Sequence, residues 1–465
     1  MSALILTADQ RSAVDGILRD IERPSARVVL CGYAGTGKTV TTAALVTRLR
    51  AIGMNVAVAT PTHKAKIQVE RALRERGANG FMCATLHALL GLKPRINSDT
   101  GKVEFLPDFG KDNRLSDRKA KEFCDQEEGE TVTVHPIDIV IVDESSMVNE
   151  FLYKLLLKEA DDRPIVFVGD DRQLLPVKED KVCRAFVDAK SVYRLEEVLR
   201  HDGAILNLAT ATRQLTVGRA KFTDSIGGGS RVASYWRREQ WMDSLLEIMT
   251  SSDAMSDPDY CRALAYYNKS VEALNKAIHA KRYGANAPRF VEGMTCVTVD
   301  AIPDPILLNG SPLLNSTIDV LIKSANVEQF KAPDDDPQDS DWKTWVLDVE
   351  GCDVTTAVTV RVIHEDDAER WKASQKKIAD AAKACTDSAE RKQWWDIFWH
   401  RSNQFGKLQP ASALTVHKSQ GSTFRNVFLH WDIDGWGSAP SAQQNQLAYV
   451  GITRAAESLH VIRDR

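Results

Sequence analysis

Short apolar runs alternate with helical stretches over residues 1–190, and this alternation predicts a fold class. Runs rich in β-branched residues stand at 27–31, 55–59, 137–142 and 165–168. They do not alternate between apolar and polar positions, which is typical of strands buried on both faces of a parallel sheet. We therefore expect an α/β architecture with a parallel sheet. A second α/β pattern begins at Tyr193 and returns from Leu414 to the C-terminus.

Two segments interrupt this pattern. Residues 91–136 contain Asp99-Thr100-Gly101, which predicts a hairpin turn, and then a basic and an acidic run that are typical of a solvated insertion. Residues 291–363 show short alternating segments that predict β-structure, and residues 364–400 are helical and charged. Trp394, Trp395 and Trp399 lie there at helical spacing and predict a stripe packed between domains.

Composition limits the class of protein without naming it. The chain has 465 residues with 43% hydrophobic and 27% charged residues, which is typical of a globular protein and excludes a disordered one. A net charge of −4 excludes a chain that coats nucleic acid indiscriminately, but it does not exclude a local nucleic-acid site. Eight scattered cysteines without a Cys-x-x-Cys pair predict free thiols.

Targeting signals are not recognisable in this sequence. The apolar run at Ala3–Leu6 is too short for the core of a signal peptide, and no run approaches the roughly 18 apolar residues of a membrane helix. These features predict a cytoplasmic protein with no membrane partner.

A phosphate-binding loop follows the first predicted strand. Residues 32–39 fit Gly-x4-Gly-Lys-Thr between a strand and a helix, which is the context that confirms this motif. The loop supplies Gly35, Thr36, Gly37, Lys38 and Thr39. Backbone N–H groups of such a loop cradle phosphates, Lys38 is expected to reach the β- and γ-phosphates, and Thr39 is expected to bind Mg²⁺. The loop predicts a nucleotide but not a reaction.

Two carboxylates follow the third predicted strand. Asp143 and Glu144 come directly after Val140–Val142. Hydrolysis of a nucleotide needs a residue that holds the metal and a residue that positions the attacking water. Asp143 fits the metal role and Glu144 the role of general base. Because a dedicated kinase has no need to activate water, the pair favours a nucleoside triphosphatase.

A third strand end repeats this arrangement at residues 169–176. Gly169-Asp170-x-x-Gln173 follows an apolar strand, at the edge where open parallel sheets bind ligands. Gln173 is therefore expected to sense a γ-phosphate or to orient water.

Together these motifs resemble the ATPase motifs of superfamily 1 helicases, and the remaining helicase motifs follow in order. They are Leu6-Thr7-x-x-Gln10, residues 60–63, residues 85–87, Leu195-x-x-Val198-Leu-Arg200, residues 413–421 and residues 449–455. The motif at 415–421 and the β-like insertion before it resemble the RecD-like (1B) branch. Within that branch, residues 265–275, 395–399 and 402–405 are similar to the Dda-like helicases.

The resemblance implies two RecA-like P-loop NTPase cores with parallel sheets. One small hairpin insertion and one β-rich (SH3-like) plus helical insertion would complete the fold. The implied boundaries are 1–90 and 131–190 for core 1A, 91–130 for insertion 1B, 191–290 and 405–465 for core 2A, and 291–404 for insertion 2B.

The resemblance also implies roles for single residues at the nucleotide. Arg200 and Arg454 would reach across a cleft from the second core to the γ-phosphate. Gln10 would read adenine, and Gly421 would join the nucleotide-binding set. The implied cofactors are ATP and Mg²⁺, the metal being held by Thr39 and Asp143.

A track for single-stranded DNA is implied by the same motifs. Its candidate residues come from both cores and comprise Pro61, Thr62, His63, Lys64, Thr85, His87, Pro94, Asn268, Lys269, Thr415, His417 and Lys418. The hairpin at 99–105 resembles a wedge that splits duplex DNA, with Phe105 as a stacking residue; an inert loop is the alternative.

The function implied is that of an ATP-dependent DNA helicase moving 5′ to 3′ on single strands. Two alternatives stay open, namely a DNA-stimulated ATPase that displaces bound proteins and a RecD-like subunit of an exonuclease complex. The implied partners are single-stranded and fork DNA. A single-strand binding protein or a replisome are further candidates, and the protein is expected to work as a monomer.

Overall fold

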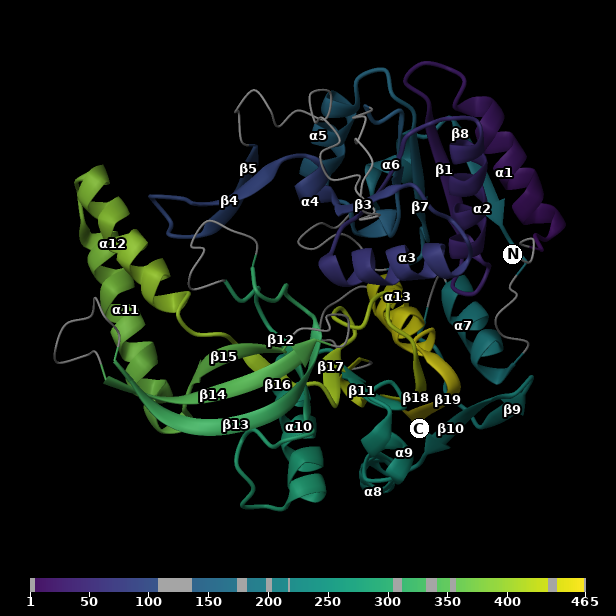
Figure 1. The fold of residues 1–465 in the computed structure, drawn as a ribbon. Helices are drawn as coiled ribbons and strands as arrows, with labels where there is room; N and C mark the ends of the chain where they lie inside the picture. The colour runs from purple at the N-terminus through teal and green to yellow at the C-terminus, as the bar shows by residue number, and fades with distance from the viewer. Residues whose placement is uncertain are drawn as a thin grey trace.

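The computed structural model describes residues 5–107, 136–173, 182–197, 203–215, 218–303, 312–331, 341–351, 357–433 and 441–463. In these residues the chain forms two helix-flanked, mainly parallel sheets, a β-hairpin, and an antiparallel sheet that carries two long helices (Figure 1). Arg200, the basic run at 111–121 and the acidic runs at 125–130 and 334–336 lie outside the described residues.

The first core contains a sheet of strand order β3-β2-β6-β7-β1-β8 in which every described pairing is parallel. Its strands are β1 (Arg27–Gly32), β2 (Val56–Thr60), β3 (Met82–Thr85), β6 (Ile139–Val142), β7 (Ile165–Gly169) and β8 (Ser191–Leu195). The helices are α1 (Ala8–Asp20), α2 (Lys38–Ala51), α3 (His63–Glu75), α4 (Leu86–Leu89), α5 (Glu150–Ala160) and α6 (Arg184–Asp188), with a 3₁₀ turn η1 (Ser145–Met147).

Both faces of this first sheet are buried, which explains its unbroken apolar strands. Along β1, Val28 and Leu30 belong to the hydrophobic cluster on one face, whereas Val29 and Cys31 belong to the cluster on the other. A strand that is covered on both faces gains from apolar side chains at every position. The predicted parallel α/β fold is confirmed.

The second core repeats this design with strand order β17-β11-β18-β19-β10-β9. Its strands are β9 (Ser225–Gly227), β10 (Ser230–Tyr235), β11 (Cys261–Ala265), β17 (Ala413–Thr415), β18 (Phe424–Leu429) and β19 (Ala455–Ile462), parallel except for the edge strand β9. The helices are α7 (Ala204–Gln214), α8 (Arg238–Met249), α9 (Ser252–Ser256), α10 (Asn268–Tyr283) and α13 (Ser441–Ile452), with a 3₁₀ turn η3 (Trp431–Ile433).

Each core carries one inserted segment. The first holds the hairpin of β4 (Leu92–Ile96) and β5 (Val103–Pro107). The second holds an antiparallel sheet of order β15-β14-β13-β12-β16, and two long helices lie beside this sheet (Figure 1). These elements are β12 (Thr295–Thr298), β13 (Asp319–Lys331), β14 (Asp341–Gly351), β15 (Ala357–Ile363), β16 (Leu408–Pro410), η2 (Glu365–Asp367), α11 (Ala368–Ala384) and α12 (Ser388–Ser402).

Two strands lie beyond the boundaries expected from the sequence. Strand β8 begins at Ser191, the expected start of the second core, yet it pairs in parallel with β1 and completes the first sheet. Strand β16 pairs with β12, so the inserted sheet extends past residue 404. Both are edge strands whose partners are remote in sequence, and local composition does not specify such partners.

The hairpin and α12 touch at the hairpin turn (Figure 1). Trp399 Nε1 donates to the carbonyl oxygen of Gly101 at 3.0 Å, and Arg391 forms an ion pair with Asp99. Gly101 has a φ of +66°, and a side chain there would collide with the Trp395 ring, 2.4 Å from the position of a Cβ. The predicted tryptophan stripe therefore packs between the two insertions.

Two further expectations concern described residues only. All six cysteines in the described ranges are free thiols, as predicted. Within those same ranges, no helix combines the length and the apolar character needed to cross a bilayer.

Candidate functional site: a nucleotide cleft and a DNA track

A cleft of about 460 Å³ lies between the two cores. The first core lines it with Gly35, Gly37, Lys38, Thr39, Asp143, Glu144 and Gln173. The second core lines it with Gly421, Thr423, Thr453 and Arg454. The structure therefore brings together, from distant parts of the chain, most of the residues that the sequence assigned to the nucleotide.

The phosphate loop turns from β1 into α2 with two left-handed glycines. Gly35 and Gly37 have φ of +87° and +80°, a conformation that L-residues adopt only with strain. Lys38 Nζ donates to the carbonyl oxygens of Gly32 at 2.7 Å and Tyr33 at 3.1 Å. These bonds hold the ammonium group over the loop, where the N-terminus of α2 adds positive potential.

The acid pair follows β6 on a strained backbone. Glu144 has a φ of +51° and ψ of +40°, a left-handed conformation that costs a non-glycine residue about 1–2 kcal/mol. The Glu144 N–H donates to Asp143 Oδ1 at 2.8 Å. Burial, and then the charge of Glu144, raises the pKa of the Asp143 carboxyl. Backbone strain at a cleft residue is typical of a functional position.

Unsatisfied polar atoms face this cleft. Glu144 Oε2 and Gln173 Oε1 are buried and have no hydrogen-bond partner among the described residues. A buried acceptor without a partner costs about 1–3 kcal/mol, so two of them in one cleft indicate a site for polar ligands. Glu144 is thus placed to accept a proton, and Gln173 to bind a donor.

The donor set fits Mg²⁺ bound together with a nucleotide. Thr39 and Asp143 both line the cleft. No group of three or more His, Cys, Asp or Glu residues in the described ranges could hold a metal alone. Mg²⁺ commonly takes one or two protein ligands and completes its shell with phosphates and water. Thr39 and Asp143 would therefore hold the ion.

Arg454 reaches the cleft from the loop between α13 and β19. It is buried, and its guanidinium donates to the carbonyl oxygens of Val450 at 3.1 Å and Ser422 at 3.0 Å. Its position beside the cleft agrees with the expected role at the γ-phosphate. A third bond, from Nη2 to Thr453 Oγ1 at 3.1 Å, also lies within its own core.

Neither Gln10 nor Thr36 of the phosphate loop lines the cleft. Gln10 is buried, its Nε2 donates to the Thr36 carbonyl oxygen at 3.2 Å, and its Oε1 accepts from the Thr7 N–H at 3.1 Å. In this arrangement Gln10 braces the loop, so its expected contact with adenine stays a prediction.

The track residues of the first core follow two adjacent strands. Thr60 of β2 pairs with Thr85 of β3, so residues 61–64 and residues 86–87 leave the same edge of the sheet. The side chains of Thr62 and Thr85 accept backbone N–H groups at the starts of α3 and α4, at 3.2 Å in each case. The two segments are thereby held side by side.

Lys64 has a partner that the sequence did not indicate. Lys64 Nζ lies 3.4 Å from Asp319 Oδ2, at the start of β13 in the inserted sheet, and both side chains are largely buried. This ion pair joins the first core to the insertion of the second. Lys64 is therefore not an open cation on the track in this arrangement.

Aromatic groups cluster where the hairpin leaves the first core. Phe105 is opposite Pro94 in the hairpin, and its ring lies 4.8 Å from the His87 ring. Phe105 is 46% exposed, so part of its side chain is accessible from solvent. Burial lowers the pKa values of His63 and His87, which leaves both histidines neutral near pH 7.

The second core presents its track residues in the same way. Ala265 of β11 pairs with Thr415 of β17, which places Asn268 and Lys269 near His417 and Lys418. Burial lowers the pKa values of His417 and Lys418. The two halves of the predicted track therefore come from equivalent strand pairs of the two sheets, β3 with β2 and β17 with β11.

Comparison with known proteins agrees with this geometry. The chain matches the model of an AAA domain over residues 5–233 and that of a UvrD-like helicase C-terminal domain over residues 410–462. A domain of unknown function matches residues 299–403. The chain is 25% identical to the ATP-dependent DNA helicase Dda of Enterobacteria phage T4 over 464 residues, which is 97% of each chain.

Partial similarity extends to the RecD proteins. The RecBCD enzyme subunit RecD of Mycolicibacterium smegmatis is 28% identical over 246 residues, covering 48% of this chain and 38% of that protein. The chain belongs to the RecD-like (1B) branch of the superfamily 1 helicases. A solved structure of two coordinating Pif1 helicases at forked duplex DNA has the same fold, with a TM-score of 0.51, 16% identity and coverage of 98% of this chain and 92% of that one.

Motif inspection missed several residues of this RecD-like helicase. Tyr266 and Tyr267 form a ring pair with centroids 4.7 Å apart directly before Asn268, and Tyr267 is 38% exposed. Asp432 fixes the segment by accepting the Tyr266 and Tyr267 N–H groups at 3.0 and 3.2 Å. The signal in the sequence that could have identified them is the pair of adjacent aromatic residues directly before Asn268, a predicted DNA contact.

Proposed function

We propose that this protein is an ATP-dependent DNA helicase that translocates 5′ to 3′ on single-stranded DNA and unwinds forked duplex. The observation that carries this proposal is the pairing of two sites in the same two cores. Hydrolytic residues of the first core face Arg454 of the second across one cleft. The strand pairs β2–β3 and β11–β17 of the same sheets carry the candidate track residues in two equivalent groups.

Hydrolysis follows from the residues that line the cleft. The loop amides and Lys38 bind the phosphates; Thr39 and Asp143 would hold Mg²⁺, which would neutralise phosphate charge when bound. Glu144 accepts the proton of the attacking water through its unpartnered Oε2, and Gln173 orients that water or the γ-phosphate. Arg454 stabilises the transition-state charge, which requires both cores to contribute.

Coupling to DNA runs through the segment 416–423. It connects Thr415, at the carboxyl end of β17 on the track, with Phe424, at the start of β18. On the way it passes Gly421 and Thr423, which line the cleft. A shift of this segment on closure of the cleft would therefore move Thr415 and His417 relative to the first core.

Strand separation belongs to the hairpin of β4 and β5. Phe105 and His87 form an aromatic step beside the track, and stacking on such residues is worth about 1–3 kcal/mol per base. The contact of the hairpin turn with α12 fixes the position of the hairpin while the duplex is pulled against it. The polarity of movement rests on the family resemblance.

The relatives favour a self-sufficient helicase over the alternatives. Similarity to Dda, an ATP-dependent DNA helicase by name, spans 97% of both chains, whereas similarity to the RecBCD subunit RecD spans 48% of this chain. Action as a monomer on single-stranded and fork DNA follows as part of the proposal. An obligate subunit of a complex would show no unwinding alone.

The decisive experiment is unwinding of forked DNA by the purified protein. We expect ATP-dependent unwinding of a duplex with a 5′ tail and little with a 3′ tail. Lys38→Ala is the control, expected to bind DNA but not to unwind it. Unwinding by Lys38→Ala would contradict the proposal, and unwinding only from a 3′ tail would contradict the polarity. ATP hydrolysis stimulated by DNA without unwinding would favour the protein-displacing ATPase.

A further inference from the structure

We propose that Tyr449 is a positioning residue for ATP hydrolysis, which holds the loop carrying Gln173 against the phosphate loop from the opposite core. The inference rests on the proposed function, because it concerns the same cleft. It goes further by assigning a role to a side chain that lines no part of the nucleotide cleft. We call the group of contacts involved the seam; it comprises Tyr33, Ala34, Asp170, Arg213 and Tyr449.

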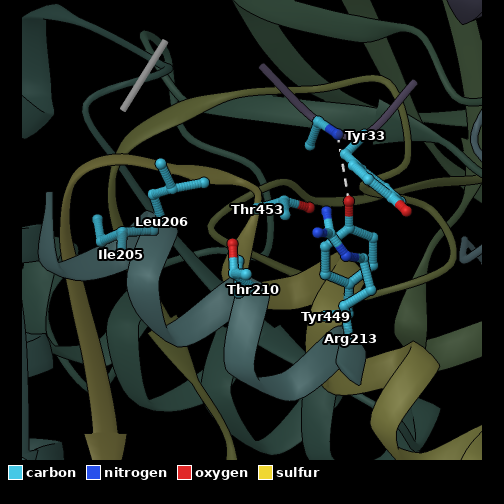
Figure 2. A pocket seen from close by; sticks show the side chains of 9 residues that line it. Tyr33, Ile205, Leu206, Thr210, Arg213, Tyr449 and Thr453 are labelled. Carbon is cyan, nitrogen blue, oxygen red and sulfur yellow. Dashed lines mark hydrogen bonds between the residues drawn. The ribbon is translucent and has the colours of Figure 1, made fainter. Parts of the chain in front are cut away.

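The Tyr449 hydroxyl joins two functional loops of the first core. Tyr449 lies on α13 of the second core, and its hydroxyl donates to Asp170 Oδ2 at 2.8 Å. The same oxygen accepts the backbone N–H of Ala34 in the phosphate loop at 3.2 Å (Figure 2). One phenol group thus ties together both loops through a donor and an acceptor bond.

Burial makes these bonds costly to lose. Asp170 is fully buried and Tyr449 is 2% exposed. Burial and the neighbouring Asp170 charge raise the pKa of Tyr449, so the phenol keeps its proton and donates. Water cannot readily replace the phenol at a carboxylate in such a place, and a buried charged group without its partner is strongly disfavoured.

Asp170 transmits the contact to Gln173. Its second oxygen, Oδ1, accepts the Arg172 N–H at 3.0 Å, and its carbonyl oxygen accepts the Gln173 N–H at 3.3 Å. The carboxylate therefore shapes the turn that presents Gln173, while Tyr449 fixes the carboxylate. The phenol of the second core acts on Gln173 through this turn.

A second contact of the seam lies beside the first. The Arg213 guanidinium on α7 stacks over the Tyr33 ring, with its carbon 3.2 Å from the ring centroid. Tyr33 and Ala34 are consecutive residues of the phosphate loop, and they meet two different helices of the second core (Figure 2). The second core therefore grips this end of the loop at two points.

Similar tyrosine–aspartate bonds elsewhere provide a comparison. Tyr193 donates to Asp20 at 2.8 Å and Tyr153 donates to Asp188 at 3.3 Å, both within the first core. The bond of Tyr449 has the length of the Tyr193 bond but joins the two cores. It therefore exists only while the cores lie close together, which links the placement of Gln173 to closure.

The test compares Tyr449→Phe with Tyr193→Phe in the full chain. Each change removes one hydroxyl that donates to an aspartate and keeps the ring. We expect Tyr449→Phe to lower the kcat of DNA-stimulated ATP hydrolysis about 10-fold or more, because bonds to charged groups contribute about 1.5–3 kcal/mol. The KM for ATP and the affinity for single-stranded DNA should change little. Tyr193→Phe should leave kcat unchanged.

Two further measurements separate positioning from stability. Thermal unfolding of both variants shows whether the loss of kcat exceeds what lost stability explains. In a double-mutant cycle, Asp170→Asn added to Tyr449→Phe should lower kcat less than the product of the two single effects. If Tyr449→Phe fails to fold, Arg213→Gln tests the same seam at its other contact and should lower kcat in the same sense.

The outcomes distinguish this inference from the proposed function. Wild-type unwinding with an unchanged kcat in Tyr449→Phe overturns the role of Tyr449 and leaves the helicase assignment intact. Equal losses of Tm and equal kcat values in Tyr449→Phe and Tyr193→Phe also overturn it. Absence of unwinding by the wild-type protein contradicts the proposed function instead, while a kcat loss confined to Tyr449→Phe supports the seam.

Discussion

In the first core, the predicted nucleotide residues and the predicted DNA residues all lie at the carboxyl ends of parallel strands. In the second core, the two sets lie at opposite ends of the strands. The phosphate loop, Asp143 and Gln173 follow β1, β6 and β7, and the track residues follow β2 and β3. In the second sheet, Thr415 ends β17 and Asn268 follows the carboxyl end of β11, but Arg454 directly precedes the amino end of β19.

This difference gives the two cores different mechanical roles. The first core carries its predicted nucleotide residues and its predicted DNA residues at the same ends of its strands, so a single sheet positions both. The second core carries Arg454 before the amino end of one strand and Thr415 at the carboxyl end of another. Residues 416–423 connect these two ends of the sheet and pass the cleft. We infer that the first core supplies most of the hydrolytic residues, whereas the second core supplies Arg454 and converts closure of the cleft into displacement along DNA.

The largest expected effect tests the contribution of the second core to chemistry. Arg454→Ala should lower DNA-stimulated kcat by about 10³–10⁵, because an arginine supplied across a cleft stabilises the charge of the transferring phosphoryl group. Steady-state ATPase measurements check this. Arg425→Ala, an arginine on the exposed side of β18 in the same core, serves as the control. A loss of less than 10-fold in Arg454→Ala would mean that the first core hydrolyses ATP by itself.

The next effect tests the first core. Glu144→Gln should lower kcat by about 10²–10⁴, because the amide cannot accept the proton of water. The variant keeps the size of the side chain and the left-handed backbone of residue 144. Affinity for a fluorescent ATP analogue should therefore stay near the wild-type value. A parallel loss of nucleotide affinity would indicate that Glu144 holds the phosphates rather than the water.

The pH dependence of the unfolding free energy tests the second core alone, because this core buries a histidine that does not line the cleft. His460 on β19 stacks on Phe428 with centroids 4.0 Å apart and bonds to the Tyr235 hydroxyl. Burial, and then the charge of Arg231, lowers the pKa of His460 to about 4 from 6.5. Between these two values the unfolded chain binds a proton that the folded chain does not.

The unfolding free energy should therefore fall as pH falls from 6.5 towards 4, by on the order of 3 kcal/mol. Above pH 6.5 this contribution is constant. His460→Gln should flatten the dependence, measured as denaturant unfolding of both proteins across this window. An identical slope in wild type and variant would place the acid sensitivity elsewhere.

A smaller effect tests the track of the second core. Tyr267→Ala should weaken binding of single-stranded DNA by roughly 5- to 150-fold, because stacking on an aromatic contributes about 1–3 kcal/mol per base. Tyr267→Phe keeps the ring and should bind as the wild type does. The salt dependence should be unchanged in Tyr267→Ala, whereas Lys269→Ala should reduce it by about one ion. Equal affinities for Tyr267→Ala and Tyr267→Phe would exclude stacking at this position.

Local pattern was sufficient for much of this molecule. The apolar strands, the phosphate loop and the acid pair could be predicted, because each depends on residues close together in sequence. The loops after β1, β6 and β7 lie close together because the carboxyl ends of neighbouring parallel strands lie on the same side of a sheet. That Arg454 lies beside these loops was predicted from the family resemblance, because the residues next to Arg454 in the sequence do not indicate it.

The remaining contacts join ordinary residues across long separations. Lys64 meets Asp319 from 255 positions away, and Tyr449 meets Asp170 from 279 positions away. No periodicity or turn signal identifies such partners, since a lysine, a tyrosine or an aspartate is unremarkable by itself. Lys64 was assigned to DNA for the same reason, because its ion pair with the inserted sheet is visible only after folding.

The smallest effect concerns one of the contacts that join the insertions of the two cores at the hairpin turn, the hydrogen bond from Trp399. Trp399→Phe keeps an aromatic ring but removes the Nε1 donor to the Gly101 carbonyl, a bond worth about 0.5–1.5 kcal/mol. Because Trp395 still packs on Gly101, the hairpin should stay docked but be held less firmly. Unwinding of forked DNA should slow by about 2- to 10-fold, and ATP hydrolysis on single-stranded DNA should be unaffected. Trp236→Phe, at a tryptophan that is 64% exposed, is the matched control. If ATP hydrolysis falls together with unwinding in Trp399→Phe, the insertions regulate the motor itself, and the division of labour between the cores does not hold.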